Sequence, residues 1–267
     1  MKSNTHRHSL LKVIGVPLKG FILGLCLTSG GLLAQTLPLP GNLIAFNSAE
    51  GEKLLMESKA LQDYFPLSMQ MVTQKNQAYC GVASSIMVLN ALSIPAPEAP
   101  EFGSFRVFTQ DNFFNAKAQQ VLPSEVVSRR GMTLEQLGKL LESYPVKTQV
   151  YHAGDVGLEK FRSLVVKNLQ EPRNFVLVNY LRKAIGQEKG GHISPVAAYN
   201  EKTDRFLILD VSRYKYPPVW VKAEDLWKAM ATLDSESGKT RGFVLVSSRQ
   251  SRADSSSQMQ IKSRPHR

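Results

Sequence analysis

The apolar residues of this chain change their spacing after residue 170. Before that point they recur at helical intervals, as in the run that follows Cys80, where Val82, Ile86 and Leu89 share one face. After it come short apolar runs of strand character, which are NFVLVNY (174–180), HISPVAAYN (192–200), RFLILDVS (205–212) and GFVLVSS (242–248). Helices followed by antiparallel strands predict an α+β fold, with a helical first half and an antiparallel sheet in the second half.

Local signals mark the ends of several predicted elements. Besides the helix at Cys80, helices are expected near residues 50–58, 133–144 and 158–170, and Thr133 with Gln136 makes a capping box at residue 133. Three prolines between residues 94 and 103 end the helix that starts at Cys80. The polar run 200–204 separates two strand-like segments and therefore predicts a β-hairpin.

The positive charge of the chain gathers at its two ends. The formal net charge is +11 over 267 residues. Residues 1–19 and 248–267 carry four of these net charges each, which leaves +3 for the 228 residues between them. A body this close to neutral lacks the basic surface of a DNA- or RNA-binding protein, so no nucleic-acid partner is expected.

The first 34 residues have the pattern of an export signal. A basic start is followed by a mostly apolar stretch that ends at Ala34. We expect cleavage there, a periplasmic protein and no membrane contact of the mature chain. The alternative is an uncleaved signal that anchors the domain to the membrane. Residues 35–248 then form one folded domain, and the Ser-rich, basic residues 249–267 form a disordered tail.

After such cleavage Cys80 is the only cysteine of the mature chain, because Cys26 lies within the signal. A single cysteine has no internal disulfide partner, so it is buried for packing, reactive or paired with another molecule. Its predicted place in the first turn of a helix favours a thiolate, because free N–H groups and the helix dipole stabilise negative charge there. Gly81 beside it would let a substrate approach the backbone closely.

A cysteine nucleophile needs a base, and the base needs a group that orients it. The histidines after the signal are His152, His192 and His266. His192 opens a strand after two glycines, and Asp210 ends the next strand at the same end of the predicted hairpin. An acid after the apolar run FLIL is costly to bury unless it is paired, and His192 is the natural partner. A bulge at Pro195 would change the register between them; the alternative role of Asp210 is to cap its strand.

The order Cys, His, Asp, with the cysteine on an early helix and the other two on later adjacent strands, is the layout of the papain-like cysteine peptidases. Five longer segments resemble the phytochelatin synthases, in particular their compact bacterial form. They are QAYCGVASSIMVLNAL, FRVFTQDNFFN, GMTLEQLGKLL, GGHISPVAAYNEKTDRFLILDVSRYKYPPVWV and SGKTRGFVLV. The resemblance covers about residues 55–248 and identifies residues 35–248 as the catalytic domain. The cysteine-rich C-terminal extension of the plant enzymes has no counterpart in this sequence.

The resemblance implies a papain-like fold and a reaction on glutathione. Cys80 would attack the carbonyl between cysteine and glycine, His192 would transfer the proton, and Asp210 would hold the imidazole tautomer. Gln74, six residues before the cysteine, matches the family's oxyanion-hole glutamine, whereas the alternative is an ordinary loop residue. The γ-glutamylcysteinyl thioester on Cys80 would pass to water, which gives γ-glutamylcysteine, or to a second glutathione, which gives phytochelatin.

Five further residues match the family's substrate contacts. They are Asn179, Gly191, Arg213, Asp234 and Arg241. A γ-glutamyl group needs a cation for its α-carboxylate and an acceptor for its α-amine, which Arg241 and Asp234 would supply. These two flank a predicted turn at residues 235–239, where a solvated salt bridge is the alternative. The aromatic run 213–220 and the segment TQDNFFN (109–115) are otherwise expected to be structural.

Two other functions stay open on the sequence. One is an exported papain-like peptidase for another γ-glutamyl or leader peptide, and release of glycine from glutathione separates it from the first. The other is a non-catalytic metal- or peptide-binding protein, which fits poorly because one cysteine and scattered histidines cannot build a closed soft-metal site.

We therefore expect no metal ligands and no tightly bound cofactor. Cd²⁺ or Zn²⁺ would act through a thiolate complex with glutathione, as part of a response to heavy metals. The sequence leaves the oligomeric state open between a monomer and a homodimer.

Overall fold

The structure is a computed structural model that describes residues 36–249. Within that range the chain forms eight α-helices, two short 3-10 helices and seven β-strands. The α-helices are α1 (Ala49–Glu57), α2 (Tyr64–Ser68), α3 (Cys80–Ala91), α4 (Ala116–Val121), α5 (Ser124–Arg130), α6 (Leu134–Leu141), α7 (Leu158–Gln170) and α8 (Ala223–Met230). The strands are β1 (Ile44–Ala45), β2 (Val146–His152), β3 (Asn174–Leu181), β4 (Gly191–Asn200), β5 (Arg205–Ile208), β6 (Val219–Lys222) and β7 (Gly242–Ser248). The 3-10 helices are η1 (Pro100–Phe102) and η2 (Arg182–Ile185).

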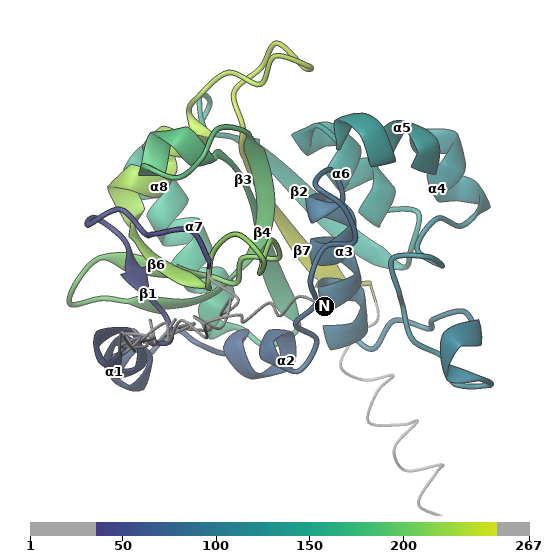
Figure 1. Cartoon of the computed structure of the whole chain (residues 1–267), viewed down its shortest axis with the longest axis horizontal. Coiled ribbons are helices and arrows are strands. Elements are labelled where there is room, and N and C mark those ends of the chain that lie inside the picture. The colour runs from purple at the N-terminus through teal and green to yellow at the C-terminus, as the bar shows by residue number, and fades with distance from the viewer. Residues whose placement is uncertain (1–35, 250–267) are drawn as a thin grey trace, which may run out of the picture. The chain divides into compact units, whose positions relative to one another are not determined.

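The seven strands form one antiparallel sheet in the order β1-β6-β5-β4-β3-β7-β2 (Figure 1). β4 lies at its centre, between β3 and β5. The last strand in sequence, β7, lies between β3 and β2. The predicted α+β class with an antiparallel sheet is confirmed.

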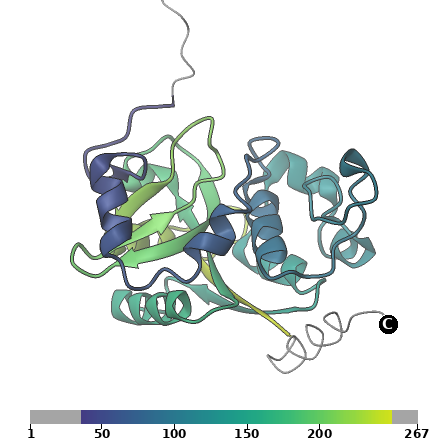
Figure 2. The same cartoon turned by 90° about the horizontal axis from the view of Figure 1, so that it is seen from below.

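Helices cover both faces of this sheet. α3 contacts β4 and α6 contacts β2 and β7 on one face, whereas α7 and α8 contact β3 on the other face. The side chains of β3 alternate accordingly: Leu177 packs into the core around α3 and α6, and its neighbours Val176 and Val178 pack into the core around α7 and α8. Figure 2 shows the purple helix α1 beside the green strands, away from the teal helices α4 to α6.

Most elements predicted from the sequence are present. α7 spans the predicted residues 158–170, α3 begins at Cys80, and Thr133 caps α6 through the predicted capping box with Gln136. The strand expected over residues 205–212 is shorter, because β5 ends at Ile208. Strand β6 and the short helices α2, α4, α5 and α8 are not evident from the sequence pattern. Each is too short for its apolar residues to show a recognisable period.

Strands β4 and β5 form the predicted hairpin around the turn at residues 200–204. A bulge lies between Val196 and Ala198, two residues beyond the predicted position at Pro195. Beyond the bulge the backbone pairing continues, and Leu209 N donates to Pro195 O at 2.9 Å.

This bulge decides which side chains share a face at the open end of the hairpin. Ala198 pairs with Leu207 on one side of it and Val196 pairs with Ile208 on the other, so the register shifts by one residue. A shift of one residue exchanges the two faces of a strand. It therefore brings Asp210, just beyond β5, to the same face as His192.

The predicted signal segment and, from residue 250 onward, the predicted tail lie outside the described residues. Within residues 36–249, no helix combines the length and the apolar character needed to cross a membrane.

Candidate active site

Cys80 is the first residue of α3, and 8% of it is exposed. Its neighbours Val82 to Leu89 are all buried, so α3 is a core helix whose first turn reaches the surface of the site. Tyr79 precedes the helix and makes no capping bond with its side chain. The backbone groups of Ile193 and Gly81 beside the sulfur lower the pKa of the thiol. Cys80 thus lies where N–H donors favour a thiolate.

A hydrogen bond joins α3 to the strand that carries the histidine. Ser84, one turn after Cys80, donates from Oγ to Ile193 O at 3.1 Å. His192 is the preceding residue of β4, and only 3% of it is exposed. Because residues four apart lie on one face of a helix, this bond aligns the face of Cys80 with His192.

The imidazole of His192 bridges the cysteine and an aspartate. Its Nε2 hydrogen-bonds Asp210 Oδ1 at 2.9 Å, and Ser194 Oγ lies 2.9 Å from the same nitrogen. Neither Asp210 nor Ser194 bonds the other ring nitrogen, and the neighbouring thiol of Cys80 contributes to the pKa of the imidazole. Burial and, to a smaller extent, the charge of Arg182 lower the pKa of His192, but the charge and hydrogen bond of Asp210 together with the contact of Cys80 raise it, so the pKa lies above the ordinary value.

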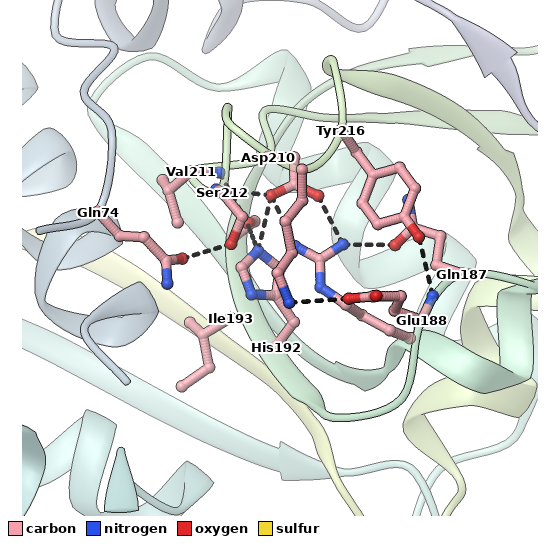
Figure 3. A network of polar contacts seen from close by, with 12 residues as sticks. Gln74, Gln187, Glu188, His192, Ile193, Asp210, Val211, Ser212 and Tyr216 are labelled. Carbon is pink, nitrogen blue, oxygen red and sulfur yellow. Dashed lines mark hydrogen bonds and ion pairs between the residues drawn. The ribbon is translucent and has the colours of Figure 1, made fainter. Parts of the chain in front are cut away.

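Arg182 is a site residue that the sequence pattern does not reveal. Its guanidinium meets Asp210 with both terminal nitrogens, Nη1 at 2.8 Å from Oδ2 and Nη2 at 2.9 Å from Oδ1. Nη1 also donates to Gln187, and the guanidinium lies 5.2 Å from the centre of the Tyr216 ring. Figure 3 shows this buried network around Asp210.

The charges around Asp210 explain why a carboxylate can be fully buried there. Burial by itself would raise its pKa, but His192 and then Arg182 lower the pKa far below the ordinary value. Asp210 is therefore ionised, with one cation on each side. Such an anion holds the orientation of the imidazole.

The thiol of Cys80 is tuned by opposing effects. Burial raises its pKa, whereas the hydrogen bond and charge of His192, followed by the N–H groups of Ile193 and Gly81, lower it. The lowering effects prevail, so the pKa of Cys80 lies below that of an ordinary thiol. A lowered cysteine pKa and a raised histidine pKa together favour the thiolate–imidazolium pair.

Gln74 is buried, lines a small cavity together with His192, and is held by hydrogen bonds of both its backbone and its side chain. Its backbone N–H donates to Val211 O at 2.9 Å, and its Oε1 accepts from Ser212 Oγ at 2.6 Å (Figure 3). One hydrogen of its Nε2 goes to Asn76 O at 2.7 Å. The amide has a second hydrogen that can serve as a donor to a ligand.

Cys80 and His192 open into a polar cavity of about 250 Å³. Four of the five predicted substrate contacts line it, namely Asn179, Gly191, Asp234 and Arg241. Arg213 does not line this cavity; its side chain is exposed in the loop after Asp210.

Asp234 and Arg241 form a sheltered ion pair at the wall of the cavity. Arg241 Nη2 lies 3.8 Å from Asp234 Oδ1, with side chains only 9% and 14% exposed. Arg241 Nη1 donates to Leu233 O, while no partner for its Nε appears among the described residues. Burial lowers the pKa of Arg241 and Asp234 opposes that shift. The cavity thus presents an anion and a cation side by side, shielded from solvent.

A family model described as phytochelatin synthase matches residues 34–243. The chain belongs to this family. It is 36% identical over 219 residues to glutathione gamma-glutamylcysteinyltransferase 1 of Arabidopsis thaliana, which covers 81% of this chain and 44% of the plant protein. It is 34% identical over 220 residues to the enzyme of the same name from Lotus japonicus, covering 81% of this chain and 42% of that protein. It is 31% identical over 211 residues to glutathione gamma-glutamylcysteinyltransferase of Schizosaccharomyces pombe, covering 78% and 50%.

This phytochelatin synthase family member therefore spans about half the length of these relatives, or slightly less. The matched region contains Cys80, His192, Asp210 and the walls of the cavity. The family assignment and the geometry of the site thus concern the same residues.

Gly81 was expected to let a substrate approach the backbone closely, but in the structure it makes room for a neighbouring side chain. A Cβ added to Gly81 would lie 2.6 Å from the sulfur of Met132, so its missing side chain makes room for Met132. Met132 lines the cavity beside Cys80. Gly81 therefore allows the close packing of the α5–α6 connection against the start of α3, and it is not among the residues that line the cavity.

The described residues offer little to a resident metal ion. Within residues 36–249, no group of three or more His, Cys, Asp or Glu side chains is placed to hold one. His152 lies at the end of β2 and bonds Glu135 and Thr240, away from Cys80.

Proposed function

We propose that this chain is a glutathione γ-glutamylcysteinyltransferase that also hydrolyses glutathione, with a papain-like fold. The observation that carries the proposal is that the Cys80–His192 pair and the sheltered Asp234–Arg241 pair line the same cavity. A nucleophile cleaves the acyl bond, and the ion pair selects the zwitterionic end of a γ-glutamyl group. The names of the family relatives support the same substrate.

In the first step, the Sγ thiolate of Cys80 attacks the carbonyl carbon of the peptide bond between cysteine and glycine. The negative charge moves to the carbonyl oxygen, where the Nε2 donor of Gln74 and backbone N–H groups at the start of α3 stabilise it. The imidazolium of His192 gives its proton to the departing amine, and the C–N bond breaks. Free glycine leaves, and γ-glutamylcysteine stays bound to Cys80 as a thioester.

In the second step, His192 takes a proton from the incoming nucleophile. Water gives γ-glutamylcysteine, whereas the α-amine of a second γ-glutamyl group gives a phytochelatin. In both cases the C–S bond to Cys80 breaks and the thiolate returns. Asp210, held by Arg182, keeps His192 in one tautomer through both steps.

Recognition of the γ-glutamyl end rests on charge complementarity. Arg241 binds the α-carboxylate and Asp234 binds the α-ammonium, while Asn179 and Gly191 line the path toward Cys80. Gly191 fits this role because a Cβ there would lie 3.3 Å from the guanidinium of Arg241. Cd²⁺ or Zn²⁺ enters as substrate, as a thiolate complex of glutathione, in a metal response.

The test is the intact mass of the protein after seconds with excess glutathione, for the wild type beside Cys80→Ser. We expect a transient adduct with the mass of γ-glutamylcysteine on the wild type alone, together with release of free glycine. The ratio of γ-glutamylcysteine to phytochelatin, measured with and without Cd²⁺, then separates hydrolysis from transfer.

Two results would count against the proposal. Absence of both adduct and glycine under reducing conditions would reject glutathione and favour a peptidase for another γ-glutamyl or leader peptide. Glycine release by Cys80→Ser at the wild-type rate would reject Cys80 as the nucleophile.

We also propose that the protein is exported to the periplasm through residues 1–34, because of their basic and apolar sequence pattern. Cell fractionation with N-terminal sequencing of the mature chain tests this. A soluble periplasmic protein that begins near residue 35 is the expected result, and a full-length protein in the membrane fraction would indicate an uncleaved anchor.

A further inference from the structure

The segment 109–115, expected from the sequence to be structural, reaches the loop that carries Gln74. Gln110 Oε1 accepts a hydrogen bond from Lys75 N at 2.7 Å, and Gln110 Nε2 donates to Thr73 O at 3.0 Å. Thr73 and Lys75 are the residues immediately before and after Gln74. One side chain therefore fixes the backbone on both sides of the proposed oxyanion donor.

The loop that carries Gln110 is itself fixed to the helix of the nucleophile. Asn90, at the far end of α3, accepts from Phe108 N at 2.9 Å and donates to Phe108 O at 3.0 Å. Asn112 closes the same loop through bonds to Thr109 N at 2.8 Å and Val107 O at 2.9 Å. A continuous set of hydrogen bonds from side chains to backbone groups thus runs from α3 through residues 107–112 to residues 73–75.

Gln74 has a second, separate attachment on the side of His192 and Asp210. Its backbone N–H bonds Val211 and its side chain bonds Ser212, the two residues after Asp210. These bonds hold Gln74 to the base, and those of Gln110 hold it to α3, where Cys80 lies. The distance between donor and nucleophile thus depends on both attachments.

We propose that Gln110 is a positioning residue, which sets the Nε2 donor of Gln74 against the carbonyl oxygen that Cys80 attacks. This inference rests on the proposed function. A displacement of a donor by about 1 Å costs up to about 100-fold in rate, so a bond to each neighbour of Gln74 has a large effect on acylation. Gln110 itself touches no reacting atom.

The test compares four proteins in single-turnover acylation by glutathione: wild type, Gln110→Met, Gln74→Ala and the double variant. Methionine fills a similar volume and makes neither hydrogen bond. We expect Gln110→Met to acylate about 10- to 100-fold more slowly with little change in KM. Gln74→Ala should lose about 100- to 1000-fold, and the double variant should equal Gln74→Ala within about threefold.

Alkylation of Cys80 by iodoacetamide, followed by peptide mass spectrometry, separates positioning from general disturbance. Alkylation needs the thiolate and creates no oxyanion, so Gln110→Met should react at the wild-type rate at every pH. Asp111→Asn is the matched control, because Asp111 also bonds Lys75 but does so through exposed side chains. Its acylation rate should stay within about twofold of the wild type.

Several outcomes would overturn the inference while the proposed function stands. One is an acylation rate of Gln110→Met within twofold of the wild type. Another is a double variant whose loss of acylation rate is the product of the two single losses. The third is a loss of the Cys80 alkylation rate in Gln110→Met that equals its loss of acylation rate. If Gln110→Met does not fold, Gln110→Glu keeps the acceptor for Lys75 N and loses the donor to Thr73 O. A wild-type rate in that variant would equally reject the inference, whereas no acylation of the wild type itself would reject the proposed function.

Discussion

Cys80 and His192 show how two buried groups can each make the other more reactive. Burial raises the pKa of the thiol, and the contact with His192, together with the backbone of Ile193 and Gly81, brings the pKa below the ordinary value. Asp210 has the matching effect on the pKa of His192, which it raises against burial. The charge separation of the pair therefore depends on a chain of neighbours that ends at Arg182.

This dependence predicts the effect of His192→Ala on the reactivity of Cys80. Without the imidazole the effect of burial dominates, so the pKa of Cys80 should rise above its wild-type value and alkylation by iodoacetamide should need a higher pH. The measurement is the alkylation rate of Cys80 against pH. His152→Gln, which changes the other histidine in the described range, should leave the profile unchanged. An unchanged profile in His192→Ala would show that His192 does not control the thiol.

A second buried acid, Asp63, has no such neighbours. It is 1% exposed, and among the described residues neither carboxylate oxygen has a hydrogen-bond partner. Burial raises the pKa of Asp63 to about 9. The folded protein therefore keeps a proton that the unfolded chain releases near pH 4, so stability should fall as the pH rises from about 4 to 9.

Asp63→Asn should remove this pH dependence and stabilise the protein at alkaline pH. The difference in unfolding free energy between variant and wild type should grow by up to about 1.4 kcal/mol per pH unit in that window. Urea unfolding at several pH values measures it. Asp155→Asn, at an exposed position, is the control with no comparable slope. Parallel curves for wild type and Asp63→Asn would contradict the prediction.

Helix α6 depends on its first residue for part of its stability. Thr133 accepts from Gln136 N at 3.3 Å, and Gln136 Oε1 accepts from Thr133 N at 2.8 Å. Thr133→Ala should lower the unfolding free energy by about 0.5–2 kcal/mol, because the part-buried N–H of Gln136 loses its acceptor. Urea unfolding with an unchanged m-value measures this loss. Ser128→Ala, on an exposed side chain of α5, should change stability by less than about 0.5 kcal/mol, and an equal loss there would reject the cap as the cause.

The elements that the sequence predicts well are those with local signals. The capping box marks α6, and the polar turn 200–204 marks the β4–β5 hairpin. Both depend on residues within a few positions of one another. The placement of β7 between β3 and β2 depends on residues far apart in the chain, and no local pattern encodes it.

The same distinction holds for the candidate site. The sequence suggests Cys80, His192 and Asp210 because each stands at the predicted end of an element, and the structure brings them together. Arg182 lies in a short polar segment after β3 with no periodic pattern, so its burial against Asp210 appears only in three dimensions. The role of Gln110 likewise cannot be read from the sequence, because its hydrogen-bond partners lie 35 and 37 positions away in the chain.

At the scale of the molecule, Arg249 is the last described residue, and it is hydrogen-bonded to the start of β2. Arg249 N donates to Pro145 O at 3.2 Å, and its Nε donates to Val146 O at 2.7 Å. A chain that stops after Arg249 should keep these bonds. Its Tm should stay within about 2 °C of the full chain, and its glycine release should be unchanged. Thermal unfolding and the glutathione assay check this, and a Tm lower by more than about 4 °C would show that the tail contributes to the fold.

The position of β7 has a consequence for the order in which the molecule can assemble. Residues 242–248 separate β3 from β2, so before they are synthesised β3 can pair only with β4, and β2 has no strand partner. A nascent or prematurely terminated chain that ends before residue 242 leaves two unpaired strand edges, which attract other chains and proteases. Pairings over such long sequence separations also close slowly, because the intervening loop must be ordered first. Among the described strands β7 therefore completes the sheet, and the newly made chain stays vulnerable until that strand has inserted.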